Sequence, residues 1–167
     1  REPEYLLCSL TFSGSHKLLE DPNVWVADTG ASTHTTPHEE GMIKARKATD
    51  DDAITVGNGN SEEPSVIADI PGTVCDKHGN ELGENCLSEV TLLPGGKYNL
   101  FSITRKQKEG WSLGGDKTGI WITKGDKKLF FDIAIPTKKG VLFAMYFKRA
   151  IAEVAGAMTD AKRMSID

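Results

Sequence analysis

The residues best suited to chemistry lie in one short run, Trp25–Ser32, with the sequence WVADTGAS. The run predicts a hydrophobic strand that ends in an Asp-Thr-Gly turn. A carboxylate that holds a water molecule against a peptide carbonyl needs a rigid strand behind it, a hydroxyl neighbour and a glycine that lets the backbone approach. Here Asp28 is the carboxylate, Thr29 is the hydroxyl neighbour, Gly30 is the glycine, and the apolar residues before Asp28 form the strand. Hydrolysis of a peptide by carboxylates needs two of them sharing one proton, and the chain has one such run. We therefore expect the second carboxylate to come from another copy of the chain.

The composition predicts one domain followed by a tail. The chain has 167 residues, enough for one ordinary core. Its 24 acidic and 20 basic residues provide no basic footprint, so we expect no direct binding of nucleic acid. No apolar run approaches the roughly 20 residues that span a bilayer, and the first residues do not resemble a signal peptide. We expect a cytoplasmic protein without a membrane partner.

Short apolar runs separated by turn residues predict an all-β fold. The chain has 17 glycines, and several of them stand between these runs. A polar, glycine-rich tip at residues 57–61 predicts a hairpin between 53–56 and 66–70. After Lys148 the apolar residues adopt helical spacing, so residues 150–167 are predicted to be a linker or a short helix, and residues 1–149 the folded domain. The other expected strands are 6–10, 24–27, 72–75, 86–93, 119–123, 128–133 and 141–147.

The Asp-Thr-Gly-Ala tetrapeptide has two interpretations by itself. The pattern Asp-Ser/Thr-Gly-Ala/Ser, which it fits, arises by chance in about one chain of this length in a hundred, so Asp28 could also be a structural residue that caps a turn. A preceding apolar strand, a glycine-rich hairpin some tens of residues later and a later apolar segment favour the catalytic interpretation. All three occur here.

Four blocks carry a family resemblance: WVADTGASTH (25–34), ITVGNG (54–59), VTLLPGGKYNLFSI (90–103) and GVLFAMYFKR (140–149). In this order they resemble the retropepsin-like aspartic proteases of copia-type long-terminal-repeat retrotransposons, over most of residues 22–149. Two departures stand out. The Leu92–Phe101 segment has no arginine where retroviral relatives carry one, and Ser32 replaces an acidic residue that is common there.

The resemblance implies a closed retropepsin-like barrel with a flap hairpin and extra C-terminal strands. It implies a homodimeric aspartic endopeptidase that cuts its own Gag-Pol-type polyprotein, within cytoplasmic virus-like particles and without a cofactor. Asp28 would be catalytic, and Thr29 would reach across to the partner's equivalent loop. The other residues that it implies are Gly30, Ala31 and Ser32 in the active-site loop, Gly57, Asn58, Gly59, Asn60 and Ser61 in the flap, and His34, Asn99 and Leu100 in structural support.

Metal binding and a disulfide are the remaining chemical alternatives. His34 with His38, or Cys75 with His78, contain zinc-binding residue types, but their spacing lacks two close ligand pairs, so we expect no metal. The three cysteines form no regular framework, although a bridge between Cys75 and Cys86 across a hairpin is an alternative to free thiols.

Two functional alternatives stay open beside the protease. One is a retropepsin-fold module that binds peptides or dimerises without cutting, and the other is an unrelated β-sandwich with a coincidental triplet. Residues 112–149 are more than a minimal retropepsin needs. We expect this extra segment either to enlarge the sheet of the dimer or to pack over the barrel. We expect the 6–10 and 141–147 strands to pair across a dimer, because open edges are a liability.

Overall fold

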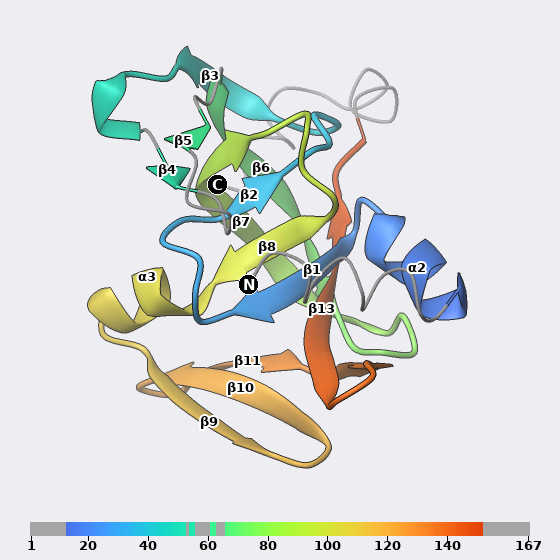
Figure 1. The fold of residues 1–167 in the computed structure, drawn as a ribbon. Helices are drawn as coiled ribbons and strands as arrows, with labels where there is room; N and C mark the ends of the chain where they lie inside the picture. The colour runs from blue at the N-terminus through green and yellow to red at the C-terminus, as the bar shows by residue number, and fades with distance from the viewer. Residues whose placement is uncertain (1–12, 53, 56–60, 63–65, 152–167) are drawn as a thin grey trace.

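The computed structural model describes residues 13–52, 54–55, 61–62 and 66–151. Strands account for 55% and helices for 11% of it, which confirms the all-β prediction. Figure 1 shows the elements. In chain order they are α2 (Ser13–Glu20), β1 (Val24–Asp28), β2 (Thr35–Thr36), β3 (Ile43–Lys47), the 3-10 turn η1 (Asp50–Asp52), β4 (Ile54–Thr55), β5 (Ser61–Glu62), β6 (Val66–Cys75), β7 (Glu81–Leu92), β8 (Asn99–Ser102), α3 (Ile103–Lys108), β9 (Ser112–Asp116), β10 (Gly119–Lys124), β11 (Lys127–Phe131), β12 (Ile133–Pro136) and β13 (Val141–Arg149).

Six strands form a closed barrel, which confirms the closed barrel that the resemblance implied. Their order is β13-β1-β8-β2-β7-β6, and β13 closes the ring by pairing with β6. The β1–β8 and β2–β7 pairs are parallel, and the others are antiparallel. Closure brings the two backbones together at Gly72, where a Cβ atom would lie only 2.4 Å from the Lys148 carbonyl oxygen. Any larger residue at position 72 would push the closing strands apart.

The run of apolar residues in β1 is explained by burial on both faces of the strand. Trp25 packs into the larger core with Phe101 of β8 and Phe147 of β13. Val24 and Val26 point the other way, into a smaller core that includes Leu19 of α2 and Ile135 of β12. Because alternate side chains of a strand face opposite sides, a strand covered on both sides needs continuous rather than alternating hydrophobicity.

A separate three-stranded sheet, β11-β10-β9, packs over the barrel. Ile122, Leu129 and Phe131 from this sheet belong to the larger core, and the Phe131 ring meets that of Phe101 edge-on at 5.0 Å. The segment after residue 112 therefore both covers the barrel, through β9–β11, and completes it, through β13.

Several expected strand pairings were wrong. The 141–147 segment is not an open edge, because β13 pairs with β1 along one side and with β12 and β6 along the other. The strand expected at 66–70 does not pair with 53–56: β4 pairs with β5, whereas 66–70 and 72–75 form one continuous strand, β6. Residues 6–10 and nearly all of the 150–167 tail lie outside the described residues.

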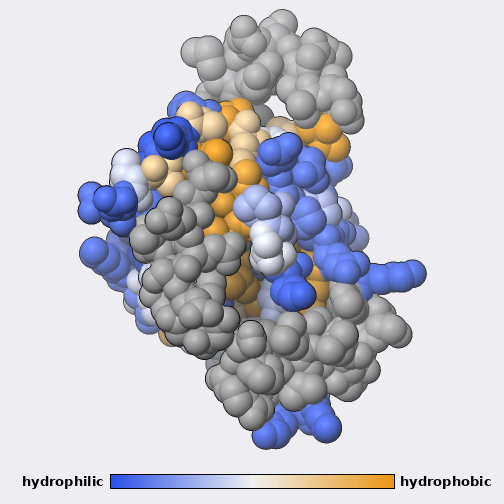
Figure 2. Space-filling view, turned by 45° about the horizontal axis from the view of Figure 1, so that its top comes forward, coloured by the Kyte–Doolittle hydropathy of each residue, from blue (hydrophilic) through white to orange (hydrophobic). Residues whose placement is uncertain are grey.

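The surface alternates between apolar and polar areas. Figure 2, in which the side that is uppermost in Figure 1 comes forward, shows hydrophobic residues in a central band with hydrophilic residues on both sides. Neither described helix is long and apolar enough to cross a membrane. Cys75 and Cys86 form no bridge, because the β6–β7 register places them opposite Glu81 and Pro71 respectively.

The two phenylalanines of β11 test the packing of the outer sheet on the barrel. Phe131 is fully buried, whereas its neighbour Phe130 is 41% exposed on the opposite face. We expect Phe131→Ala to lower the free energy of unfolding by about 3 to 5 kcal/mol, because it leaves a cavity in the core. The matched variant Phe130→Ala should cost about 1 kcal/mol or less. Urea unfolding of both variants measures the difference, and equal losses would contradict the described orientation of β11.

Candidate active site

The parallel pairing of β1 with β8 positions the Asp-Thr-Gly turn. It places Asp28, the last residue of β1, opposite Ser102, the last residue of β8. The Asp28 carboxylate oxygen Oδ1 accepts a hydrogen bond from the Gly30 N–H at 2.6 Å. Asp28 is half-buried, but Thr29 and Gly30 are exposed. The carboxylate is thus oriented by its own turn at an open surface.

Two hydroxyl groups anchor the turn from behind. The Ala31 carbonyl oxygen accepts hydrogen bonds from Ser102 Oγ at 2.6 Å and from Thr104 Oγ1 at 3.0 Å. Ser102 Oγ also accepts the Arg105 N–H at 3.1 Å, which caps the start of α3. One buried serine therefore fixes both the active-site loop and the helix beside it.

His34 supports this arrangement from inside the fold. Its side chain is 1% exposed, and its Nδ1 accepts the Ser102 backbone N–H at 2.8 Å. The imidazole also packs against the Phe101 ring, with centroids 4.4 Å apart. Burial, followed by the nearby charges of Arg105 and Lys106, holds the pKa of His34 well below its ordinary value of 6.5. A neutral ring is what the contact requires, because Nδ1 must be unprotonated to accept a hydrogen bond.

Asn99 secures the opposite end of β1. Its amide Nδ2 donates to the carbonyl oxygens of Pro22 and Val24, at 2.9 Å each. Its Oδ1 accepts the Thr36 hydroxyl from β2, so that one fully buried side chain connects three segments. Leu100 lies next along β8, opposite Val26, and packs against the smaller core.

Arg149, at the end of β13, completes this buried polar network. Its guanidinium donates to the carbonyl oxygens of Pro22 at 2.8 Å, His38 at 2.8 Å and Glu40 at 2.9 Å. It also reaches Thr36 Oγ1 at 2.8 Å and Asn99 Oδ1 at 3.3 Å. Burial lowers the pKa of Arg149 to about 10. Arg149 therefore ties the last strand to the end of β1 that lies away from the Asp-Thr-Gly turn.

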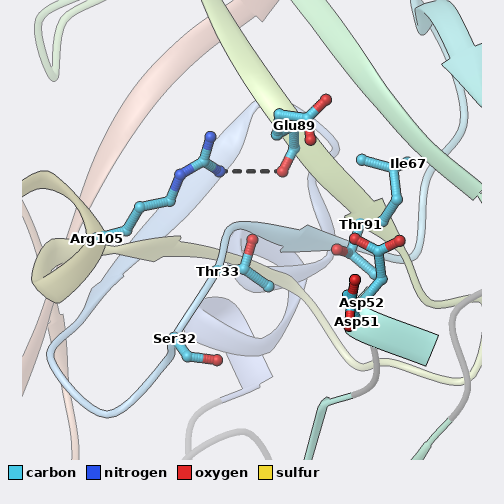
Figure 3. Close-up of a pocket in the computed structure, with 8 residues that line it drawn as sticks. All are labelled: Ser32, Thr33, Asp51, Asp52, Ile67, Glu89, Thr91 and Arg105. Atoms are coloured by element: carbon cyan, nitrogen blue, oxygen red, sulfur yellow. Dashed lines mark hydrogen bonds between the residues drawn. The ribbon is translucent and has the colours of Figure 1, made fainter. Parts of the chain in front are cut away.

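A cleft of about 330 Å³ opens beside the active-site loop (Figure 3). It begins at Ser32 and Thr33, just after the turn, and extends past α3 and β7 to η1, which precedes the β4–β5 hairpin. Arg105 crosses one side and donates to the Glu89 carbonyl oxygen at 3.0 Å. The lining residues are Ser32, Thr33, Asp51, Asp52, Ile67, Glu89, Thr91 and Arg105.

An exposed arginine organises the acidic side of the cleft. Arg46 of β3 pairs with Asp52 at 3.0 Å and with Glu89 at 2.9 Å. The hydrogen bonds from Arg46 lower the pKa of Asp52 below its usual range, and those with Asp52 and Glu89 raise the pKa of Arg46. Two of the acidic groups around the cleft are therefore already paired, and Asp52 stays ionised.

A family model described as Pol polyprotein, beta-barrel domain, matches residues 25–111, just over half of the chain. The chain belongs to this family. No curated protein and no solved structure matches it. The matched range of this Pol beta-barrel domain begins at Trp25, before the Asp-Thr-Gly turn, and ends after α3. It contains every cleft residue but not β13, although β13 is one of the six barrel strands.

The structure of the Pol beta-barrel domain brings together only some of the predicted site residues. Asp28, Thr29, Gly30, Ala31 and His34 form one unit with Ser102. Asn99 and Leu100 act at the other end of β1, and Ser32 borders the cleft. In the expected flap, Ser61 pairs with Thr55 in the β4–β5 hairpin, and Gly57, Asn58, Gly59 and Asn60 lie outside the described residues.

The sequence does not single out Ser102, Thr104 or Arg149 as site residues. Ser102 lies in the block 90–103 and Arg149 ends the block 140–149, 50 residues after Asn99. Membership of these blocks is the only sequence signal for Ser102 and Arg149. Among the described residues, no group of three His, Cys, Asp or Glu side chains is arranged to hold a metal ion.

The burial of neutral His34 predicts a specific pH dependence of stability. Its pKa is near 6.5 in the unfolded chain and lower in the folded one, so below pH 6.5 the unfolded chain binds more protons. Stability should therefore fall as the pH drops from 6.5 toward the folded pKa, by at most about 1.4 kcal/mol per pH unit for this residue. His34→Asn keeps an acceptor at the same position and removes the titration.

Urea unfolding at a series of pH values should show a shallower acid loss for His34→Asn than for the wild type. The other titrating groups, including His38 with its lowered pKa, are present in both proteins, so the difference isolates His34. Parallel curves would contradict the assignment.

Proposed function

We propose that this Pol beta-barrel domain is an aspartic endopeptidase that cleaves its own Gag-Pol-type retrotransposon polyprotein as a homodimer. The observation that carries the proposal is the Asp28 carboxylate, presented at an open surface by a turn that Ser102 and Thr104 anchor. A polar cleft begins four residues along the same loop. The family match supports a place in a retroelement polyprotein.

The reaction follows from two Asp28 carboxylates held about 3 Å apart, one from each protomer. Like charges at that distance cannot both ionise, so the pair holds one proton and titrates as a unit. The ionised carboxylate takes a proton from a bound water while the oxygen of that water adds to the peptide carbonyl carbon. The protonated carboxyl gives its proton to the carbonyl oxygen. The C–N bond then breaks as the amine nitrogen receives a proton from one carboxyl of the dyad, while the other carboxylate takes the proton of a diol hydroxyl, so that the products are an acid and an amine and the dyad again holds one proton.

The exposure of the turn supports a dimer. Thr29 and Gly30 are exposed in the single chain, although they follow a strand buried on both faces. A symmetric contact between two copies would bury these residues and bring the two carboxylates to the axis. Thr29 would then meet the partner's loop, as the resemblance implies.

The cleft supports an extended peptide as the substrate. Its lining offers Ser32, Thr33 and Thr91 hydroxyls, with Ile67 as an apolar contact. Such a mixture suits a peptide backbone, whose N–H and C=O groups need partners once they leave water. The β4–β5 pair follows η1 at the far side of the cleft and would serve as the base of a flap. Cytoplasmic particles assembled from the polyprotein are the proposed setting.

A precursor that extends beyond the chain on both sides tests the activity. Asp28→Asn keeps the hydrogen bond acceptor of Asp28 but removes the ionisable group, and we expect it to abolish self-processing. Asp126→Asn, at an exposed turn between β10 and β11, is the matched control and should process at the wild-type rate. Processing that persists in Asp28→Asn would refute the proposal. A dimer that never cleaves, with Asp28 intact, would instead indicate a binding or dimerisation module.

Mixing the wild-type chain with the Asp28→Asn chain tests whether the site is shared. If each active site needs two Asp28 residues, adding an equal amount of variant to a fixed amount of wild type should reduce cleavage of a peptide to about half, because mixed dimers are inactive. The two proteins are co-expressed, or mixed under conditions that exchange subunits. Adding Asp126→Asn instead should double the rate. Unchanged activity with the Asp28→Asn chain would show that one chain cuts alone.

A further inference from the structure

Charge is strongly segregated along this chain. Residues 1–104 contain 7 basic and 17 acidic residues, whereas residues 105–149 contain 11 basic and 4 acidic residues. The net charge of the first segment is therefore -10 and that of the second is +7. The whole-chain value of -4 hides a basic region, and such asymmetry is a signal for an anionic partner.

Part of this basic region surrounds one end of the outer sheet. Lys124, Lys127 and Lys128 lie at the β10–β11 turn and are exposed. The ammonium group of Lys124 donates to the Glu109 carbonyl oxygen at 2.7 Å, which places the turn beside the end of α3 with its Lys106 and Lys108. Neither Lys127 nor Lys128 forms an ion pair with a described residue.

Two aromatic rings occupy the outer face of the same sheet. Trp121 and Phe130 are cross-strand partners, with ring centroids 6.2 Å apart. The Lys128 ammonium lies 4.9 Å from the centroid of each ring. The next residues on β10 and β11, Ile122 and Leu129, point the other way and are buried in the core. The aromatic pair is therefore on the face of the sheet that the barrel does not cover.

A glycine lets the indole lie close to the sheet. Gly114 of β9 is opposite Trp121, and a Cβ atom there would lie only 2.5 Å from the Trp121 Nε1. Glycine weakens a strand, and its presence inside one commonly marks a close approach of another group. Here it allows the indole to pack directly on the β9 backbone, next to Phe130 and Lys128.

We propose that the outer face of the β9–β11 sheet binds single-stranded nucleic acid. Unpaired bases stack on aromatic side chains of a sheet surface, and neighbouring lysines neutralise the phosphates. Trp121 and Phe130 provide the stacking surface, and Lys128, whose ammonium lies beside both rings, provides the charge on that face. Lysines alone would suit an acidic polypeptide equally well, but two adjacent rings on the outer face match the stacked bases of a single strand, so the aromatic pair favours a nucleic acid. The inference is independent of peptidase activity.

The test is fluorescence anisotropy of the full chain with fluorescein-labelled poly(U) RNA and poly(dT) DNA at low salt, with poly-glutamate as competitor. We expect both oligonucleotides to bind, with affinity that falls as salt rises. Trp121→Leu and Phe130→Ala should each weaken binding about tenfold, within the range for loss of one stacked base. Lys128→Glu should weaken binding and reduce its dependence on salt.

Lys97→Glu is the matched control for charge, because Lys97 is exposed in the acidic part of the chain, and it should leave binding near the wild-type value. Phe130→Ala keeps the test informative if Trp121→Leu does not fold, since Phe130 is 41% exposed. The proposal is overturned if neither oligonucleotide binds at low salt. It is equally overturned if both aromatic variants bind as the wild type does, or if poly-glutamate competes as well as unlabelled poly(U).

Discussion

The parallel pairing of β1 with β8 is the contact on which the candidate site depends. It joins residues about 75 positions apart and aligns the two strand ends, so that Asp28 leaves the barrel beside Ser102. From there one serine acts on three groups: its hydroxyl holds the Ala31 carbonyl and caps α3, and its N–H binds His34. A carboxylate on a flexible loop would not keep its orientation. Here the loop is connected at both ends to buried strands. This makes it rigid, as catalysis by a positioned group requires.

A buried polar network holds the other end of β1. Arg149 and Asn99 bind carbonyl groups before and within the strand, where an apolar core would leave those oxygens without partners. Arg149 is the last residue of β13, and β13 also closes the barrel against β6. The family match ends at residue 111, so the segment that closes the fold lies after it. The barrel around the candidate site is complete only when β13, some 120 residues after β1, has paired with β1 and β6.

The two faces of the outer sheet, β9–β11, carry side chains with different roles. Ile122 and Phe131 face inward and extend the core, so they stabilise the barrel that carries Asp28. Trp121, Phe130 and Lys128 face outward and contribute little to that core. The alternation of a strand makes this separation possible, because substitutions on one face leave the other nearly untouched. A second binding surface can therefore exist on the domain without disturbing the candidate site around Asp28.

The sequence by itself determined the all-β class, the strand before Asp28 and the turn that carries it, and it pointed to His34 and Asn99 as supports. The fold class, the strand and the turn depend on local patterns, namely a continuous apolar run, an Asp-Thr-Gly turn and glycines between short apolar runs, whereas His34 and Asn99 were implied by the family resemblance. Only the tertiary structure decided that β6 is one strand, that Ser102 connects the loop to α3 and that Arg149 reaches Asn99. It also showed that a chain of negative net charge carries a basic, aromatic sheet face. These features arise from pairing and burial between residues far apart in the chain, and no local pattern specifies which distant groups will meet.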